Sequence, residues 1–172
     1  MKRSVVVIFI FLTMLLAQFT LAQNQWSVSS KQDPMTGKVT WFAVSPPVSS
    51  IEKMSFPYED TKAQLVIARQ GREEWVYIAF NKEPNIVGGI IEGRYEIITT
   101  RIKWDNLQPV YVKLVQEAGL NSLHFEKDQE IIRKIIIYKK LLVELNWYGE
   151  GLVHFEFPLE GAASAIAQIR RK

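Results

Sequence analysis

Hydrophobic and polar residues alternate along most of this chain, and the alternation is plainest between Ala63 and Phe80. Two runs rich in β-branched and aromatic residues are separated there by Gln70–Arg72, a short polar turn that contains a glycine. This arrangement predicts a β-hairpin. Because both faces of each run are fairly apolar, we expect the hairpin to lie at the centre of the sheet and to be covered on both sides.

The same two-residue period predicts strands on either side of this hairpin. Strands are expected at 25–31 and 38–45, joined by the turn Asp33–Gly37, in which Asp, Pro and Gly each favour a reversal of the chain. Asn81–Gly93 is expected to be a long connection that packs against the domain. The later predicted strands are 94–104, 110–115, 120–126, 141–147 and 152–157.

Two segments change to helical spacing. Gln129–Tyr138 carries isoleucines at helical intervals, and Asp128 precedes it as an expected N-cap. Leu159–Ile169 is rich in alanine and is followed by three cationic residues, which suit a helix C-terminus. The sequence therefore predicts a mainly β protein: an antiparallel β-sandwich or small barrel of about eight to nine strands, with a short helix near 128–138 and a C-terminal helix.

The first 22 residues have the order of a secretory signal peptide. Lys2 and Arg3 form a basic start, Val5–Leu16 is apolar, and Thr20–Ala22 supplies small residues before a cleavage site after Ala22. A membrane anchor is the alternative, although a spanning helix needs about 20 apolar residues. We expect residues 23–172 to form a single exported domain, periplasmic or extracellular, with no membrane span in the mature chain.

Charge and cysteine content exclude several functions. The 172 residues carry a net charge of +3, and loss of Lys2 and Arg3 with the leader would leave the charge nearly balanced. A mixed, nearly neutral surface argues against a dedicated nucleic-acid binder. The chain has no cysteine, so it forms no disulfide and carries no thiolate for zinc or redox chemistry.

The polar residues give no recognisable catalytic pattern. His124 and His154 fall on separate strands, and His154 shares a strand face with Glu156, which we interpret as part of a surface cross-strand pair rather than a metal or catalytic pair. Ser164 lacks the strand–turn–helix setting of a nucleophile elbow. We expect no catalytic residue, no metal and no cofactor, and hence no enzyme. A hydrolase site built from carboxylates or histidines distant in sequence stays open.

Aromatic residues at strand ends are the candidate binding residues. Trp104, Trp147 and Tyr148 lie where predicted strands meet turns, and exposed aromatic faces can bind a protein or a glycan. Packing in the core is the alternative interpretation. Basic residues at 133–134, 139–140 and 170–172 could form a patch for an anionic envelope surface, or could simply be solvated.

Several of these pieces together resemble one protein family. They are the opening Trp26-Ser27-Val28 strand, the Asp33–Gly37 turn, the central hairpin, an internal Arg101, and Phe157–Gly161 before an alanine-rich helix. In this order the chain resembles the VasI/TagO family of periplasmic accessory proteins associated with type VI secretion. The resemblance extends from about residue 26 to residue 169. This chain lacks the cysteine pair common in the family, and the resemblance supplies no catalytic or binding residue.

Two functions follow as hypotheses. The first is a non-enzymatic accessory or interaction module that binds envelope proteins, with secretion-system components as the partners implied by the resemblance. The second is a carbohydrate- or peptidoglycan-binding module that uses the aromatic residues at strand ends.

Overall fold

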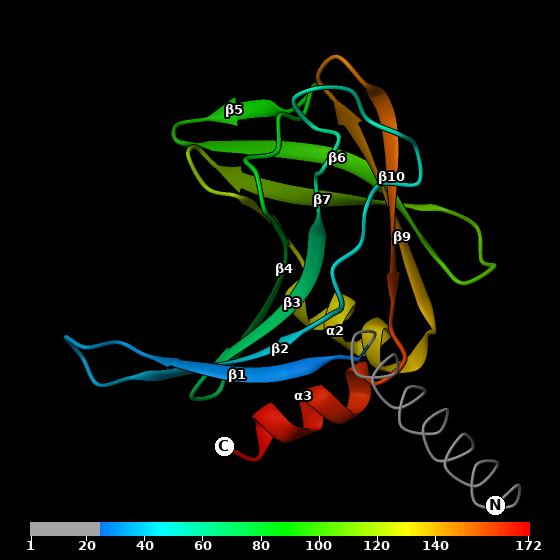
Figure 1. The fold of residues 1–172 in the computed structure, drawn as a ribbon. Helices are drawn as coiled ribbons and strands as arrows, with labels where there is room; N and C mark the ends of the chain where they lie inside the picture. Colours follow the sequence, from blue (N-terminus) through cyan, green and yellow to red (C-terminus); the bar gives the residue numbers. More distant parts are fainter. Residues whose placement is uncertain (1–24) are drawn as a thin grey trace, which may run out of the picture.

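The computed structural model describes residues 25–172, and the predicted signal peptide therefore lies outside the described residues. One antiparallel sheet dominates the fold, in the order β1-β2-β3-β4-β8-β7-β6-β9-β10, with β5 paired to β6 alone. The sheet curls into a half-barrel rather than forming two stacked layers (Figure 1). The predicted class, mainly antiparallel β with a late short helix and a C-terminal helix, is confirmed.

The strand bounds follow the predicted alternation closely. The strands are β1 (Ser27–Gln32), β2 (Val39–Val44), β3 (Ala63–Gln70), β4 (Glu73–Phe80), β5 (Ile90–Glu92), β6 (Tyr95–Trp104), β7 (Val110–Glu117), β8 (Ser122–Phe125), β9 (Lys140–Trp147) and β10 (Gly151–Pro158). The one unpredicted strand is β5, which lies inside the stretch expected to be a connection. It is short and fully exposed, so no alternation between buried and exposed positions reveals it.

The central hairpin is confirmed as β3 and β4, paired from Ala63↔Phe80 to Gln70↔Glu73. Gly71 takes a positive φ of 62° in the turn, a conformation that favours glycine. Both faces of β3 are buried, because Leu65 and Val66 are 0% and 4% exposed. The hairpin lies within the sheet, between β2 and β8, as its apolar faces predicted. The expected cover on both sides holds for β3 only, because Trp75, Tyr77 and Ala79 on one face of β4 are half-buried.

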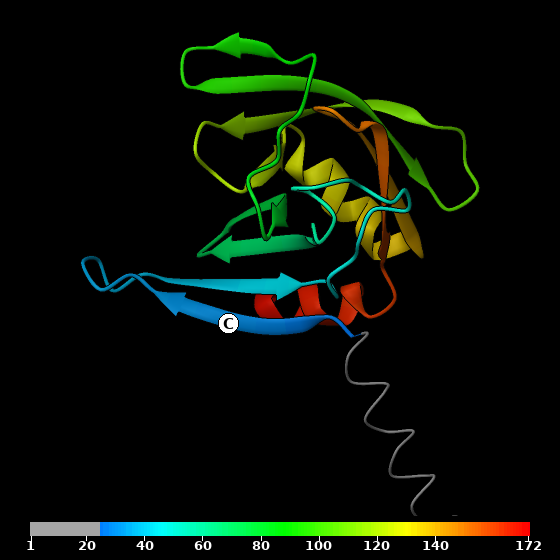
Figure 2. The same ribbon diagram turned by 45° about the horizontal axis from the view of Figure 1, so that its top comes forward.

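Two helices pack on the face of β1–β4 that points into the half-barrel. Helix α2 (Asp128–Ile137) lies inside the curve of the sheet, and α3 (Ala162–Arg170) lies beside it (Figures 1 and 2). The expected Asp128 N-cap is wrong. Asp128 is the first helical residue, and its Oδ1 accepts a hydrogen bond from the Val76 backbone N–H at 2.7 Å. Its carboxylate therefore joins α2 to β4.

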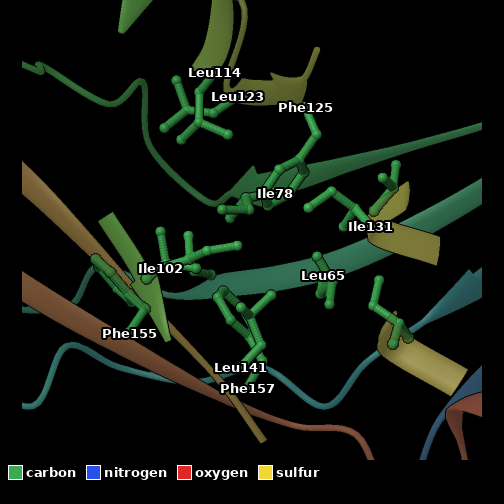
Figure 3. Packing of buried hydrophobic residues seen from close by; sticks show 14 of the residues in the cluster. Leu65, Ile78, Ile102, Leu114, Leu123, Phe125, Ile131, Leu141, Phe155 and Phe157 are labelled. Carbon is green, nitrogen blue, oxygen red and sulfur yellow. The ribbon is translucent and has the colours of Figure 1, made fainter. Parts of the chain in front are cut away.

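Apolar side chains from strands and helices converge in one core inside this curve (Figure 3). Leu65 and Ile78 come from the β3–β4 hairpin, Leu141 and Phe157 from the β9–β10 hairpin, and Ile131 from α2. The isoleucine stripe of α2 points into this core as predicted: Ile131, Ile132 and Ile135 are buried. Helix α3 begins at Ala162, three residues later than predicted, and Leu159 before it is buried.

A segment after β2 partly closes the half-barrel. Its Val48 bridges to Ala63 of β3 and its Ser50 bridges to Phe155 of β10. The segment thus crosses between two strands that the sheet order places far apart. Of the helices in the part of the chain described, none has the length and apolar character needed to cross a membrane.

Candidate functional site

The structure buries two of the three aromatic residues proposed to bind a partner. Trp147 is 1% exposed, and its ring packs against Tyr58, Phe80 and Phe155. Trp104 is 2% exposed and packs against Tyr138, which lies between α2 and β9. Only core packing explains these two tryptophans, because neither ring offers a free face to a partner in this structure.

Tyr148 differs from its neighbour, since it is 64% exposed at the turn between β9 and β10. Its backbone N–H donates to Asn85 O at 2.8 Å, which fixes the turn and leaves the ring at the surface. The three residues therefore form no common binding surface. Residues distant in sequence, such as Tyr58 and Phe80 against Trp147, bury these rings, and sequence position alone does not show such contacts.

A charged cluster surrounds His154 on β10. Its Nδ1 lies 2.7 Å from Glu52 Oε1, and its Nε2 lies 3.2 Å from Glu144 Oε2, on the paired residue of β9. Arg101 of β6 donates to both oxygens of Glu144, at 2.8 and 2.6 Å. The predicted cross-strand pair at His154 exists, but its partner is Glu144. Glu156 bonds instead to Lys140 at 2.8 Å.

These contacts shift the titration of the carboxylates. The hydrogen bonds from Arg101, opposed by partial burial and aided by His154, hold the pKa of Glu144 below its ordinary value. Partial burial raises the pKa of Glu52, but the hydrogen bonds from the ring and backbone N–H of His154 outweigh it and leave the pKa lowered. Both carboxylates are therefore charged near neutral pH.

The chemistry of this cluster is that of a clamp. Both ring nitrogens of His154 face carboxylates, so neither is left to act on a substrate. The His154 backbone N–H also donates to Glu52, and Ile51 N–H donates to His154 O. The cluster thus fixes the segment that closes the half-barrel. Within residues 25–172, no three His, Cys, Asp or Glu side chains are arranged to hold a metal ion.

His124 lies in a second, smaller cluster. Its ring stacks on Tyr77 with centroids 4.9 Å apart, and its Nε2 is 3.3 Å from Ser122 Oγ. Burial lowers the pKa of His124, with Asp128 and Glu117 opposing the shift. Burial raises the pKa of Asp128, whose Oδ1 already bonds to a backbone N–H of β4. The histidine is therefore held neutral in an aromatic stack, which is a packing role.

A groove opens where β7 and α2 diverge. Strand β8 pairs with β7 only at Leu114–Gln116. Strand β6, on the other side, pairs with β7 along the whole length of β7. The chain then leaves β8 and enters α2, which packs against β4 and α3. This leaves a hollow of about 390 Å³ beside the first half of β7. We call it the β7–α2 groove; it is lined by Thr99, Val110–Lys113, Phe125–Lys127, Glu130, Ile131 and Lys134.

The groove has an apolar floor and a charged rim. Phe125 and Ile131 are 3% and 2% exposed and form the floor, while Tyr111 on the rim is 75% exposed. Three lysines and two glutamates line the hollow. Lys134 pairs with Glu130 at 2.9 Å and Lys113 with Glu126 at 3.8 Å, whereas Lys127 takes part in none of the ion pairs described for residues 25–172.

A second hollow of about 440 Å³ lies between the loop before β5 and the β5–β6 hairpin. Tyr58 and Tyr95 line it together with the side chains of Glu83, Asn85 and Glu96. Gln116 on its inner side is 7% exposed and donates from Nε2 to Pro84 O at 2.8 Å. This hollow combines tyrosine rings with planar polar side chains.

Neither hollow was predicted from the sequence. Strand β7 itself was predicted, but its free half arises because β8 is short and α2 follows it at once. The only available signal is the nearness of Phe125 to the helix start at Asp128. No family model, curated protein or solved structure matches this chain.

Proposed function

We propose that this protein is an exported, non-enzymatic interaction module of the bacterial envelope that binds a protein partner through the β7–α2 groove. The groove carries the proposal, because it joins an apolar floor to an exposed aromatic rim and a strand edge. The export signal and the VasI/TagO resemblance of the sequence support an accessory role near the type VI secretion machinery.

The clamp at His154 supports the same proposal because its residues hold the fold together. The cluster joins Glu52 and Glu144 to the imidazole of His154, while Arg101 binds Glu144, and it links the closing segment to β9 and β10. The ring nitrogens of His154 and both carboxylate oxygens of Glu144 are engaged in hydrogen bonds within the cluster. A rigid scaffold with an open groove suits recognition, since a preformed surface loses little conformational freedom on binding.

The test is a charge reversal at the groove in the organism that makes the protein. Lys113→Glu with Lys127→Glu places two acidic groups on the rim without touching the core. We expect loss of the co-purifying envelope partner and of secretion-dependent killing of a competitor strain, with unchanged abundance and unfolding midpoint. Lys38→Glu with Lys53→Glu, at two exposed lysines outside the groove, is the matched control. Retention of the partner by the groove variant would reject the proposal.

Export has its own direct measurement. Mass spectrometry of the protein recovered from a periplasmic or culture-medium fraction should give an N-terminus at Gln23. An intact Met1 in a cytoplasmic fraction would contradict the exported location.

The hollow beside Tyr58 and Tyr95 favours glycan binding as a second candidate function. Tyrosine rings that stack on sugar faces, with amide and carboxylate groups for hydroxyls, are the elements that such a site needs. Pelleting with purified peptidoglycan separates the two functions. Binding that Glu96→Gln weakens and the groove variant leaves unchanged would favour the glycan module over the protein-binding module.

A further inference from the structure

Along the groove, the backbone N–H and C=O groups of β7 that face it have no neighbouring strand to bond to in the described part of the chain. Lys113 O accepts a hydrogen bond from Glu126 N–H at 3.1 Å, so this carbonyl points toward the β8 side. In an antiparallel ladder, the N–H and C=O of one residue point to the same side, and residues two apart share that side. Tyr111 therefore also directs its N–H and C=O toward the groove. No backbone hydrogen bond described for residues 25–172 reaches Tyr111 there.

The open edge of β7 continues on the side where β8 pairs, beyond the point at which β8 ends. The β7–β8 register runs Gln116↔Leu123, Val115↔His124 and Leu114↔Phe125, and one further bond joins Glu126 to Lys113. The next positions along β7 are Val112, Tyr111 and Val110, which pair only with β6. At about 3.3 Å per residue, these positions can bind a short extended segment of three to four residues.

We propose that the β7–α2 groove binds an extended peptide segment of a partner protein as an added strand beside β7, with apolar and acidic side chains in alternation. This inference rests on the proposed function and names the form in which the partner is recognised. Unpaired strand edges are templates for such addition, and the backbone bonds supply affinity while alternate pockets supply specificity.

The side chains of the added strand follow from the register. A residue opposite Val112 points to the inner side, toward Phe125 and Ile131, where an apolar side chain would complete the core. A residue opposite Tyr111 points to the outer side. Lys113 lies on that same outer side of β7, and its bond to Glu126 is long at 3.8 Å. The groove carries three lysines against two glutamates, and Lys127 takes part in none of the ion pairs described for residues 25–172. This excess of positive charge favours acidic side chains at the outer positions.

The charges also argue against a second copy of this chain as the occupant. Pairing two β7 edges would bring together two groove linings that each carry three lysines against two glutamates. Like charges placed opposite one another in a sheet destabilise the pairing. A partner of opposite charge avoids this repulsion.

The experiment uses a phage-displayed library of random decapeptides, selected on the purified protein. We expect enrichment of peptides that alternate apolar residues with Asp or Glu. A synthetic copy should bind Lys113→Glu/Lys127→Glu about tenfold or more weakly than the native chain, and Lys38→Glu/Lys53→Glu as well as the native chain. N-methylation of the peptide should weaken binding only at alternate residues, because only every second N–H faces β7.

Hydrogen exchange with the bound peptide locates the strand. The Tyr111 amide should exchange at least about tenfold more slowly in the complex. Absence of enriched peptides, peptides without the alternation, equal binding to the groove variant, or no protection at Tyr111 would overturn the inference. If the natural partner is still lost from the groove variant, the proposed function stands and the partner docks by a folded surface. If it is retained, both fail.

Discussion

His154 contacts two carboxylates at once, one from a neighbouring strand and one from the segment that closes the half-barrel. A neutral imidazole donates to one carboxylate, whereas an imidazolium donates to both. The residue is 28% exposed, so solvent screens these bonds only in part. Removal of this side chain should therefore cost more than removal of an ordinary surface ion pair.

His154→Ala is expected to lower the free energy of unfolding by about 1–3 kcal/mol, since it leaves two partly buried carboxylates without this partner. Glu156→Ala is the matched control on the same strand face. It removes an exposed pair with Lys140, which is worth about 0–1 kcal/mol. Urea denaturation at pH 7 measures both. Equal losses in the two variants would show that the His154 cluster is not a clamp.

Glu74 predicts a dependence of stability on pH. Its hydrogen bonds from Arg170, opposed by burial, hold the pKa of its carboxyl below the ordinary value of 4.5. A carboxyl with a lower pKa in the folded state stabilises the fold fully above the unfolded pKa. That contribution disappears as the pH falls through the folded pKa. Glu74→Gln should therefore cost about 1–2 kcal/mol at pH 7.

The cost of Glu74→Gln should shrink as the pH falls from about 4.5 toward 3. Urea midpoints of the native chain and the variant, measured at matched pH values over this range, give the difference. A difference that stays constant down to pH 3 would mean that the ion pair with Arg170 does not join α3 to β4 in solution.

At the scale of elements, the sequence predicted most of the sheet, since strands with one buried face carry their own two-residue period. The sequence predicts a cap at Asp128 because it shows the start of the helix but not the β4 backbone N–H that the carboxylate binds. Strand β5 was missed because Ile90 and Ile91 are both exposed, at 67% and 78%, and show no alternation. The groove could not be predicted, since it depends on where β8 stops relative to β7.

The placement of helix α2 against the core can be tested by the same Ile→Ala substitution at a buried and at an exposed position. Ile132 is 0% exposed and Ile137 is 72% exposed. Ile132→Ala should cost about 2–5 kcal/mol, because it removes buried methyl groups and leaves a cavity. Ile137→Ala should stay within about 0.5 kcal/mol of the native chain. Thermal or urea unfolding distinguishes them. Similar effects would contradict the placement of α2 against the core.

In the molecule as a whole, the segment around Ser50 bridges the gap of a curled sheet. Helix α2 lies inside the curve, and α3 packs beside it against β1–β3 (Figure 1). One half of β7 remains open beside this packed core, because its residues 110–112 pair with β6 alone. The candidate residues predicted at strand ends lie elsewhere: Trp104 and Trp147 became part of the core, and Tyr148 stands alone at a turn.

Site-specific photo-crosslinking in living cells shows whether a partner docks at the β7–α2 groove. A photoreactive amino acid placed at Tyr111 on the groove rim is compared with the same group at Tyr148 and at Met35, which are also exposed. We expect one discrete adduct with an envelope protein from position 111 and none from the other two. An adduct from position 148 or 35 alone, or no adduct at 111, would contradict docking at this groove.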